Sequence, residues 1–504
     1  MKLTTATLLA FASMTMLASP AFAQDKNVTV VLTEVLEVVD PCMAARSDVG
    51  RVVLQNVSET LTEFDPGTSK LLPRLATEWE QVNDTTWRFK LRPGVKFHDS
   101  STLDPADIEF SLKRNKTAAL GCEVGAKYFG ATEFTTKAID DTTVEVTSNP
   151  GSPILPLLLS ILPIQPSEDP VDKFTTTPNG TGPYKFAAWD VGQSATLVRN
   201  DDYWGEKPVV EKATYLFRTD AAVAAAMVLA GEADIAPNIA VQDATNPETD
   251  LSYPNSETST LRIDATLPPM NDRRVREALN LAIDRNAMIG TVFAPGVVPA
   301  TQQVPPTTIG FNKDLKPWPY DLERAKKLLA EAKADGVPVE TEIQMVGRIN
   351  IYPNATEVME GIQAMLLEAG FNATLQMFEV GEWNRYFVKP YPEPRTPNLV
   401  QCQHDNAKGD PVFTAFVKHH TEGAHSAMSD PETDKLITEA TAASGDERTA
   451  LWEKLFAHVN DEYIADIPLF YMVGFSRVGP RLDFKPTIAT NSELQLSQIR
   501  FKAQ

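Results

Sequence analysis

The residues best suited to chemistry gather between positions 402 and 425. Four of the six histidines of the chain lie in this segment, with thiol and acidic side chains among them: His404, His419, His420, His425, Cys402, Asp405 and Asp410. Imidazole and thiolate groups suit nickel, zinc or copper, so the segment could hold a transition metal, with three histidines as ligands: His404, His419 and His420. The segment lacks the spacing of a specific metal motif. Loop histidines with no shared role are the simpler interpretation, so we expect no metal.

Motifs of common hydrolases and nucleotide-binding enzymes are missing from the sequence. The chain has no Gly-x-Ser-x-Gly, His-Glu-x-x-His or Cys-x-x-Cys. The segment 179–184, Asn-Gly-Thr-Gly-Pro-Tyr, lacks the lysine of a phosphate loop, and Pro183 removes a backbone donor. We therefore expect no catalytic residues and no cofactor. An exported hydrolase remains an alternative that any substrate turnover would reveal.

Composition and charge describe an acidic globular protein. The chain has 504 residues, 43% of them hydrophobic, and a formal net charge of −21. Such a charge argues against nucleic acid or anionic lipid as a partner.

Apolar periodicity and turn residues place these side chains on an α/β framework. The alternation from Trp79 to Leu91 predicts a hairpin that turns at Asn83-Asp84, and Asp104 with Pro105 predicts the start of a helix. A strand at 339–345, a helix at 355–369 and a strand at 373–378 form a unit typical of parallel sheets. The stretch 272–288 is helical by spacing, with Arg273 to Arg276 and Glu277 expected on its solvent face.

The stretch from Leu75 to Arg114 is the most recognisable part of the chain. Together with Pro73 just before it, this stretch contains a long series of distinctive positions: Leu75-Ala76, Trp79, Trp87, Phe89, Leu91-Arg92, Gly94-Val95, Phe97-His98-Asp99, Ala106, Asp107 and Phe110-Ser111. This pattern resembles the family 5 extracellular solute-binding proteins of ABC importers, the group of the oligopeptide-, dipeptide- and nickel-binding proteins. Ser100 stands where the family usually has glycine. The resemblance covers nearly the whole mature chain and thins at 387–430.

The resemblance implies a two-lobed α/β fold of the periplasmic binding protein type, type II in its large cluster C form, with a hinge between the lobes. We expect lobe one at 24–262 with 480–504 returning to it, and lobe two at 263–479. An extra subdomain at about 57–184 would be inserted in lobe one.

The resemblance also implies ligand-binding residues. Glu34 follows the first strand, and Asp405 is the counterpart of an aspartate that holds the α-amino group of a peptide, although the Gly-Trp that normally precedes it is absent. Asp264 stands at the expected hinge. Further cleft candidates are Tyr128, Arg348, Trp383 and His404. If Glu34, Asp264 and Asp405 share the cleft, they favour a ligand with a cationic group.

The N-terminus has the order of a secretory signal peptide. Lys2 precedes an apolar run and Ala21-Phe22-Ala23, so we expect cleavage after Ala23, which leaves 481 residues and, without Lys2, a net charge of −22. In an oxidising periplasm, Cys42 and Cys122 are the expected disulfide pair because each lies in a short loop sequence; three buried free thiols are the alternative.

These observations predict a periplasmic receptor that closes on a short peptide or an amino-acid-derived solute such as an opine. Its expected partners are the ligand and the membrane subunits of an ABC importer with their cytoplasmic ATPases, and we expect a monomer. A receptor for a metal or metal chelate is the second hypothesis.

Overall fold

A computed structural model describes residues 25–65, 68, 70–130, 132–349 and 351–503. Within these ranges no helix is both long and apolar enough to cross a membrane. The predicted signal peptide, residues 1–23, lies outside the described residues.

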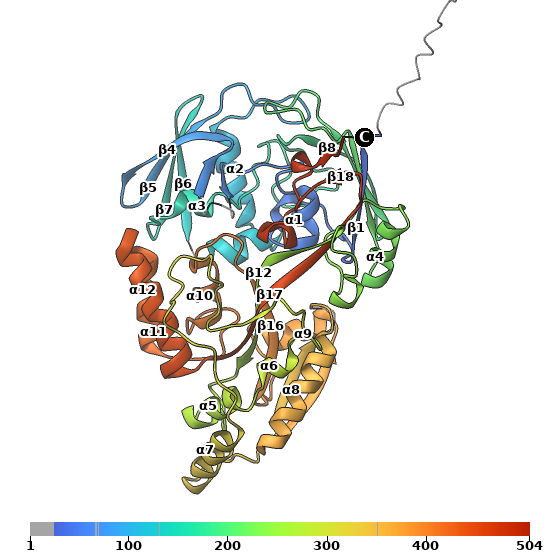
Figure 1. Ribbon diagram of the computed structural model, residues 1–504. Helices are drawn as coiled ribbons and strands as arrows, with labels where there is room; N and C mark the ends of the chain where they lie inside the picture. The colour runs from blue at the N-terminus through green and yellow to red at the C-terminus, as the bar shows by residue number, and fades with distance from the viewer. Residues whose placement is uncertain (1–24, 66–67, 69, 131, 350, 504) are drawn as a thin grey trace, which may run out of the picture.

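One mixed sheet runs through the molecule (Figure 1). In the described residues it has 11 strands, and β13 (Val298–Pro299) pairs with β17 at its side. The other strands follow one another in this order: β15 (Ala373–Phe378), β14 (Ile343–Arg348), β16 (Asn398–Asp405), β12 (Asp250–Ile263), β17 (Asp466–Val478), β11 (Ile235–Ala236), β1 (Asn27–Leu32), β10 (Lys212–Phe217), β9 (Ser194–Arg199) and β8 (Tyr184–Asp190).

The long strands β12 and β17 belong to both halves of this sheet. The first part of β12, 250–254, pairs with 473–477 of β17 near β11, whereas 258–262 pairs with 466–471 of β17 and with β16. The β12–β17 register shifts between Pro254 and Thr258, next to a proline that cannot donate a ladder hydrogen bond. We call the half on the β11 side lobe one and the half on the β16 side lobe two.

Lobe one carries a separate four-stranded sheet in the order β4 (Ala76–Asn83), β5 (Thr86–Leu91), β7 (Thr143–Asn149) and β6 (Glu133–Asp140). The predicted hairpin and its turn are confirmed by β4 and β5. The predicted helix start is confirmed as well, since Asp104 caps the next helix in a capping box with Asp107. This sheet has its own apolar core, which includes Phe89, Ile108 and Val144.

Helices cover both lobes: α1 (Ser47–Val53), α2 (Pro105–Asn115), α3 (Leu155–Leu158), α4 (Ala221–Leu229), α5 (Arg273–Leu281), α6 (Arg285–Met288), α7 (Leu322–Ala334), α8 (Ala355–Ala369), α9 (Val380–Phe387), α10 (Val412–His419), α11 (Pro431–Ala442) and α12 (Gly445–Ala457). Short helical turns are η1 (Pro41–Met43), η2 (Gly125–Phe129), η3 (Val241–Asp243), η4 (His458–Tyr463), η5 (Ile488–Asn491) and η6 (Leu496–Gln498). Two small ribbons pair β2 (Thr62–Asp65) with β3 (Lys70–Pro73) and β18 (Leu482–Asp483) with β19 (Arg500–Phe501).

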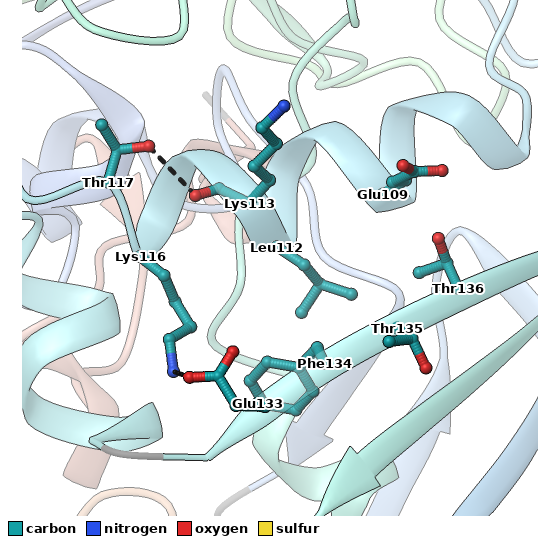
Figure 2. A pocket seen from close by; sticks show the side chains of 9 residues that line it. All are labelled: Glu109, Leu112, Lys113, Lys116, Thr117, Glu133, Phe134, Thr135 and Thr136. Carbon is teal, nitrogen blue, oxygen red and sulfur yellow. Dashed lines mark hydrogen bonds and ion pairs between the residues drawn. The ribbon is translucent and has the colours of Figure 1, made fainter.

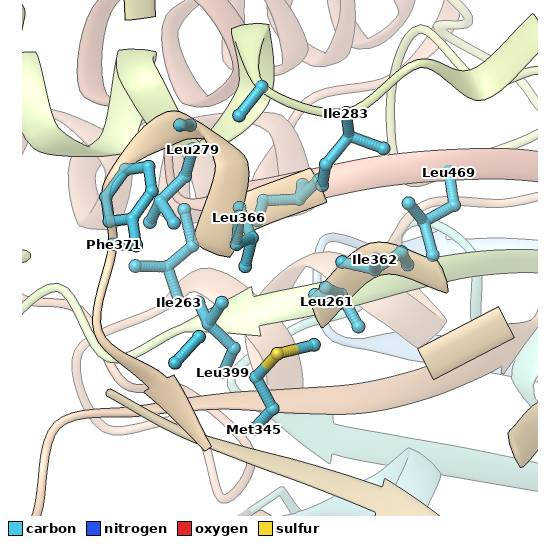
Figure 3. Close-up of a cluster of buried hydrophobic side chains, with 14 of the residues drawn as sticks. Leu261, Ile263, Leu279, Ile283, Met345, Ile362, Leu366, Phe371, Leu399 and Leu469 are labelled. Atoms are coloured by element: carbon cyan, nitrogen blue, oxygen red, sulfur yellow. The ribbon is translucent and has the colours of Figure 1, made fainter. Parts of the chain in front are cut away.

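The core of lobe two confirms the predicted strand–helix–strand unit. β14 and β15 are parallel and α8 connects them. Ile362 and Leu366 of α8 pack with Met345 and with Leu261 and Leu399 of the neighbouring strands (Figure 3).

The predicted helix over 272–288 is wrong in two respects. The chain forms two helices, α5 and α6, interrupted at 282–284. Arg276 and Glu277 are also buried rather than solvent-facing. The Arg276 guanidinium donates to the backbone carbonyls of Met270, before α5, and of Tyr463 in η4, which bury it.

Cys42 and Cys122 form a disulfide with their Cα atoms 5.2 Å apart, which is the pair expected from the sequence. Cys402 is a buried free thiol on β16.

Candidate ligand-binding site

The carboxyl ends of parallel strands from both lobes meet at the middle of β12 and β17. According to the strand pairing, β1 of lobe one points toward this region from one side, and β14 and β16 of lobe two point toward it from the other. Ligands of open α/β sheets commonly bind beyond the carboxyl ends of the strands. Glu34 follows β1, Arg348 ends β14, and His404 and Asp405 end β16, so the fold brings these four predicted residues to the boundary between the lobes.

Glu34 of lobe one and Arg348 of lobe two lie close enough across this boundary for the charge of Glu34 to act on the guanidinium. Burial lowers the pKa of Arg348, and the negative charges of Glu34 and Glu257 partly oppose that effect. Glu34 itself accepts from Arg51 Nη1 at 2.7 Å and from Ser47 Oγ at 2.9 Å. The charge of Glu34 is therefore already balanced within lobe one.

Trp383 lies beneath Arg348 rather than on an open wall. The guanidinium carbon of Arg348 lies 5.4 Å from the Trp383 ring centroid, the indole Nε1 donates to Gln401 O at 2.9 Å, and the ring stacks on Phe387 at 4.4 Å. Arg348 Nε has no hydrogen-bond partner among the described residues. Trp383 thus holds the guanidinium in place, and Arg348 is the group that can bind a ligand oxygen.

Lys127, which the sequence analysis missed, links two of the predicted residues. It is next to Tyr128 in the chain, and the charge of Asp405 acts on it. Asp405 accepts hydrogen bonds from Ser256 Oγ and from the Ala407 backbone. Lys127 lies 5.2 Å from the Tyr128 ring centroid. Burial acts to lower the pKa of Lys127, but Tyr128 and then the carboxylate of Asp405 outweigh it, so the pKa is raised. This group joins η2 of lobe one to β16 of lobe two.

His404 is buried and neutral. Burial lowers its pKa well below the usual value, and the positive charges of Lys418 and Lys127 add to this effect. Lys418, on α10, is the second residue that the sequence analysis missed. It lies on the buried side of the helix, and no local pattern shows that the side chain reaches a site.

The structure does not bring Asp264 to the other predicted residues. It follows the far end of β12, about seven residues along the ladder from the Glu257–Asp405 pair, which corresponds to roughly 23 Å. Its carboxylate is buried and binds Arg395 and Thr266. Asp264 therefore fixes a loop at the outer end of the strands.

The proposed metal ligands also diverge. His419 Nε2 lies 2.7 Å from Asp466 Oδ2, and His420 stacks on Phe416 with Asp434 nearby. His404, by contrast, is buried on β16, where the charge of Lys418 acts on it. The described residues contain no group of three or more His, Cys, Asp or Glu side chains that could hold a metal ion. The metal alternative is therefore not supported by the geometry.

Two pockets differ in their relation to this boundary. One of about 640 Å³ lies between α2 and β6 within lobe one, where Lys116 pairs with Glu133, and none of the predicted ligand-binding residues lines it (Figure 2). The other, about 350 Å³, is lined by β2, by Ala407 and Lys408 after β16, and by the C-terminal segment. Lys408 Nζ lies 3.7 Å from Glu493 there, so this second pocket lies between the lobes and next to Asp405.

Comparison with known proteins identifies the family. The sequence pattern of the bacterial extracellular solute-binding proteins, family 5 Middle, matches residues 70–394. The chain belongs to this family. A relative, the probable di/tripeptide-binding protein 5 of Pseudomonas aeruginosa (strain UCBPP-PA14), is 29% identical over 92% of this chain and 93% of its own length.

Solved structures support the two-lobed fold. The ABC transporter-associated periplasmic binding protein DppA from Helicobacter pylori, in complex with peptide STSA, has a TM-score of 0.82 and 21% identity over 95% of this chain and 98% of its own. The binding protein AgaA from A. tumefaciens R10, in complex with agropinic acid, has a TM-score of 0.79 and 21% identity over 95% and 99%. At these identities the likeness concerns the fold.

Proposed function

We propose that this protein is the periplasmic substrate-binding receptor of an ABC importer and that it captures a short peptide or an amino-acid-derived solute between its lobes. It carries out no chemistry on the solute and uses no cofactor. The family membership supports this class, and its relatives are binding proteins.

The observation that carries the proposal is the placement of unpaired and charged groups where the two lobes meet. The charge of Glu34 in lobe one acts on Arg348 of lobe two, and the charge of Asp405 in lobe two acts on Lys127 of lobe one. Arg348 Nε has no hydrogen-bond partner among the described residues. Contacts of this kind differ between an open and a closed receptor, so a ligand that adds to them favours closure. The nearby pocket of about 350 Å³ falls within the usual size range of small-molecule sites.

We propose that the hinge of this receptor lies within the two shared strands. The register shift in β12 suggests a crossover at 254–258, matched by 471–473 in β17. These positions lie a few residues inside the predicted lobe limits at 262 and 479, and the inserted subdomain at about 57–184 stays in lobe one.

The setting follows from the signal-like N-terminus and the family. The chain is exported, cleaved after Ala23 and acts as a monomer that docks, when closed, on two membrane subunits with two ATPases. N-terminal sequencing of the periplasmic protein tests the cleavage.

The ligand class is tested by purifying the protein from its native periplasm, unfolding it, and analysing the released material by mass spectrometry and elemental analysis. A stoichiometric peptide or amino-acid derivative supports the proposal. Stoichiometric metal without an organic solute, or no bound material under any growth condition, would contradict it.

A further inference from the structure

The side chain of Lys418 is buried in lobe two without an acceptor among the described residues. It is 4% exposed, and its Nζ lies 4.7 Å from the centroid of the Phe387 ring. The same ring lies 4.2 Å from the imidazole of His425. A buried ammonium group that no acceptor contacts is strongly unfavourable, so this arrangement calls for a negatively charged or acceptor-rich partner.

Three other polar atoms of this neighbourhood lack a hydrogen-bond partner within the described ranges: His404 Nε2, His425 Nδ1 and Thr258 Oγ1. Thr258 pairs directly with His404 across β12 and β16, so both side chains lie on one face of the sheet. The charge of Lys418 contributes to lowering the pKa of both His404 and His425, after burial as the main cause, and the pKa of His425 falls to about 2. We call Lys418, His404 and His425 the Lys418 cluster.

The Lys418 cluster lies where the lobes meet. Phe413, on the same helix as Lys418, contacts the Tyr128 ring of η2 at 5.0 Å between centroids. Lys127 of η2 is close enough that its charge also acts on both histidines of the cluster. Lobe one therefore adds a second positive charge to the cluster when the lobes are together.

The carboxylates around the cluster are already engaged. Asp405 accepts from Ser256 and Ala407, and its charge acts on Lys127. Asp410 pairs through Oδ1 with Arg448 at 2.7 Å, whereas its Oδ2 has no hydrogen-bond partner among the described residues and so does not bind Lys418. Arg262, the other nearby cation, donates to Phe387 O, Tyr386 O and Asn398 Oδ1. The positive charge of Lys418 thus stands without a counter-ion in the described part of the chain.

We propose that the Lys418 cluster binds a carboxylate of the transported solute. An ammonium group and neutral imidazole N–H groups can together donate to both oxygens of a carboxylate. The inference rests on the proposed function and narrows it to solutes that are anionic at this end. It replaces the cationic ligand expected from Glu34, Asp264 and Asp405, because Glu34 is paired with Arg51 and Asp264 lies elsewhere.

The test compares the wild-type protein with Lys418→Met, which keeps a chain of similar length on Phe387 and removes the charge. The matched control is Lys389→Met, since Lys389 is a half-buried lysine of lobe two whose Nζ already donates to Thr421 O at 2.7 Å. Each full chain is expressed in the native host, purified from the periplasm and unfolded, and the released solute is measured by mass spectrometry. The melting temperature of each ligand-free protein is measured after refolding.

The inference predicts that the wild type and K389M release a solute that bears a carboxylate. It predicts that the amount released by K418M is at least about tenfold smaller. It also predicts that ligand-free K418M melts no lower than the wild type, because a buried amine without an acceptor has been removed. Equal retention by K418M, a lower melting temperature that accounts for the loss, or a released solute with no anionic group would overturn it. Release of no solute by the wild type would instead contradict the proposed function.

A second measurement compares two ligands on the wild type and on K418M. Once identified, the released acid and its primary amide are titrated into the ligand-free protein. The inference predicts that the amide binds at least about tenfold more weakly, and that this difference vanishes in K418M. Equal affinity of acid and amide for the wild type would overturn the inference and leave the proposed function intact.

Discussion

His98 makes the stability of this protein sensitive to mild acid. Its ring connects the turn after β5 to the 180–182 loop: Nε2 lies 3.0 Å from Gly182 O, and Gly180 N donates to Nδ1 at 3.4 Å. The carbonyl requires Nε2 to carry the proton, so Nδ1 must remain an acceptor. Protonation of the ring would remove that acceptor.

The size of the effect follows from the pKa. Burial lowers the pKa of His98 from 6.5 to about 4, with Lys185 adding to the shift and the Gly182 hydrogen bond opposing it. The unfolded chain therefore takes up a proton near pH 6.5, whereas the folded chain does so near pH 4. Between these values the free energy of unfolding falls as the pH falls, by about 3 kcal/mol in all. Above pH 6.5 the full stability is present.

The measurement is urea denaturation of the wild type and of His98→Gln at pH 7.5 and pH 4. Other buried histidines, such as His404, add their own acid sensitivity to both proteins, so the difference between them isolates His98. We expect the wild type to lose about 3 kcal/mol more than H98Q over this interval. The same pH dependence in both proteins would refute the reasoning.

Three further predictions concern other parts of the fold. Replacing Cys42 and Cys122 by serine should lower the free energy of unfolding by about 2–5 kcal/mol in denaturant titrations under oxidising conditions, and no change would argue against the disulfide. Asp264→Ala should cost about 2 kcal/mol, because it leaves the charge of Arg395 unpaired, while solute retention stays at the wild-type level; a loss of retention at full stability would return Asp264 to the site. Asp405→Ala should weaken solute binding about tenfold in calorimetric titration, since it removes the charge that faces Lys127 at the lobe boundary, and unchanged affinity would exclude this role.

Features that depend on neighbouring residues could be predicted from the sequence. The hairpin of β4 and β5 follows from alternation between Trp79 and Leu91, and the start of α2 follows from Asp104 and Pro105. The unit β14–α8–β15 follows from its apolar pattern in the same way. Each of these depends on interactions within about forty residues of chain.

Features that depend on distant contacts could not be predicted. Arg276 has the spacing of a solvent-facing residue, yet η4 supplies carbonyl acceptors that bury its guanidinium. Lys127 and Lys418 are nearly three hundred residues apart, and they approach because α10 docks on η2 through Phe413 and Tyr128. Asp264 lies away from the other predicted residues for a related reason. The sequence around it does not show at which point along the long strand β12 the lobes meet.

The central claim is that a solute brings the two lobes together. Ala138 of β6 and Ala330 of α7 are exposed positions on lobe one and lobe two, and cysteine at both sites accepts spin labels while Cys402 stays buried. Double electron–electron resonance gives the distribution of distances between the two labels, first in the ligand-free protein and then after addition of the solute released from the native protein. The account predicts a shorter and narrower distance distribution with the solute, whereas identical distributions together with measurable binding would contradict it.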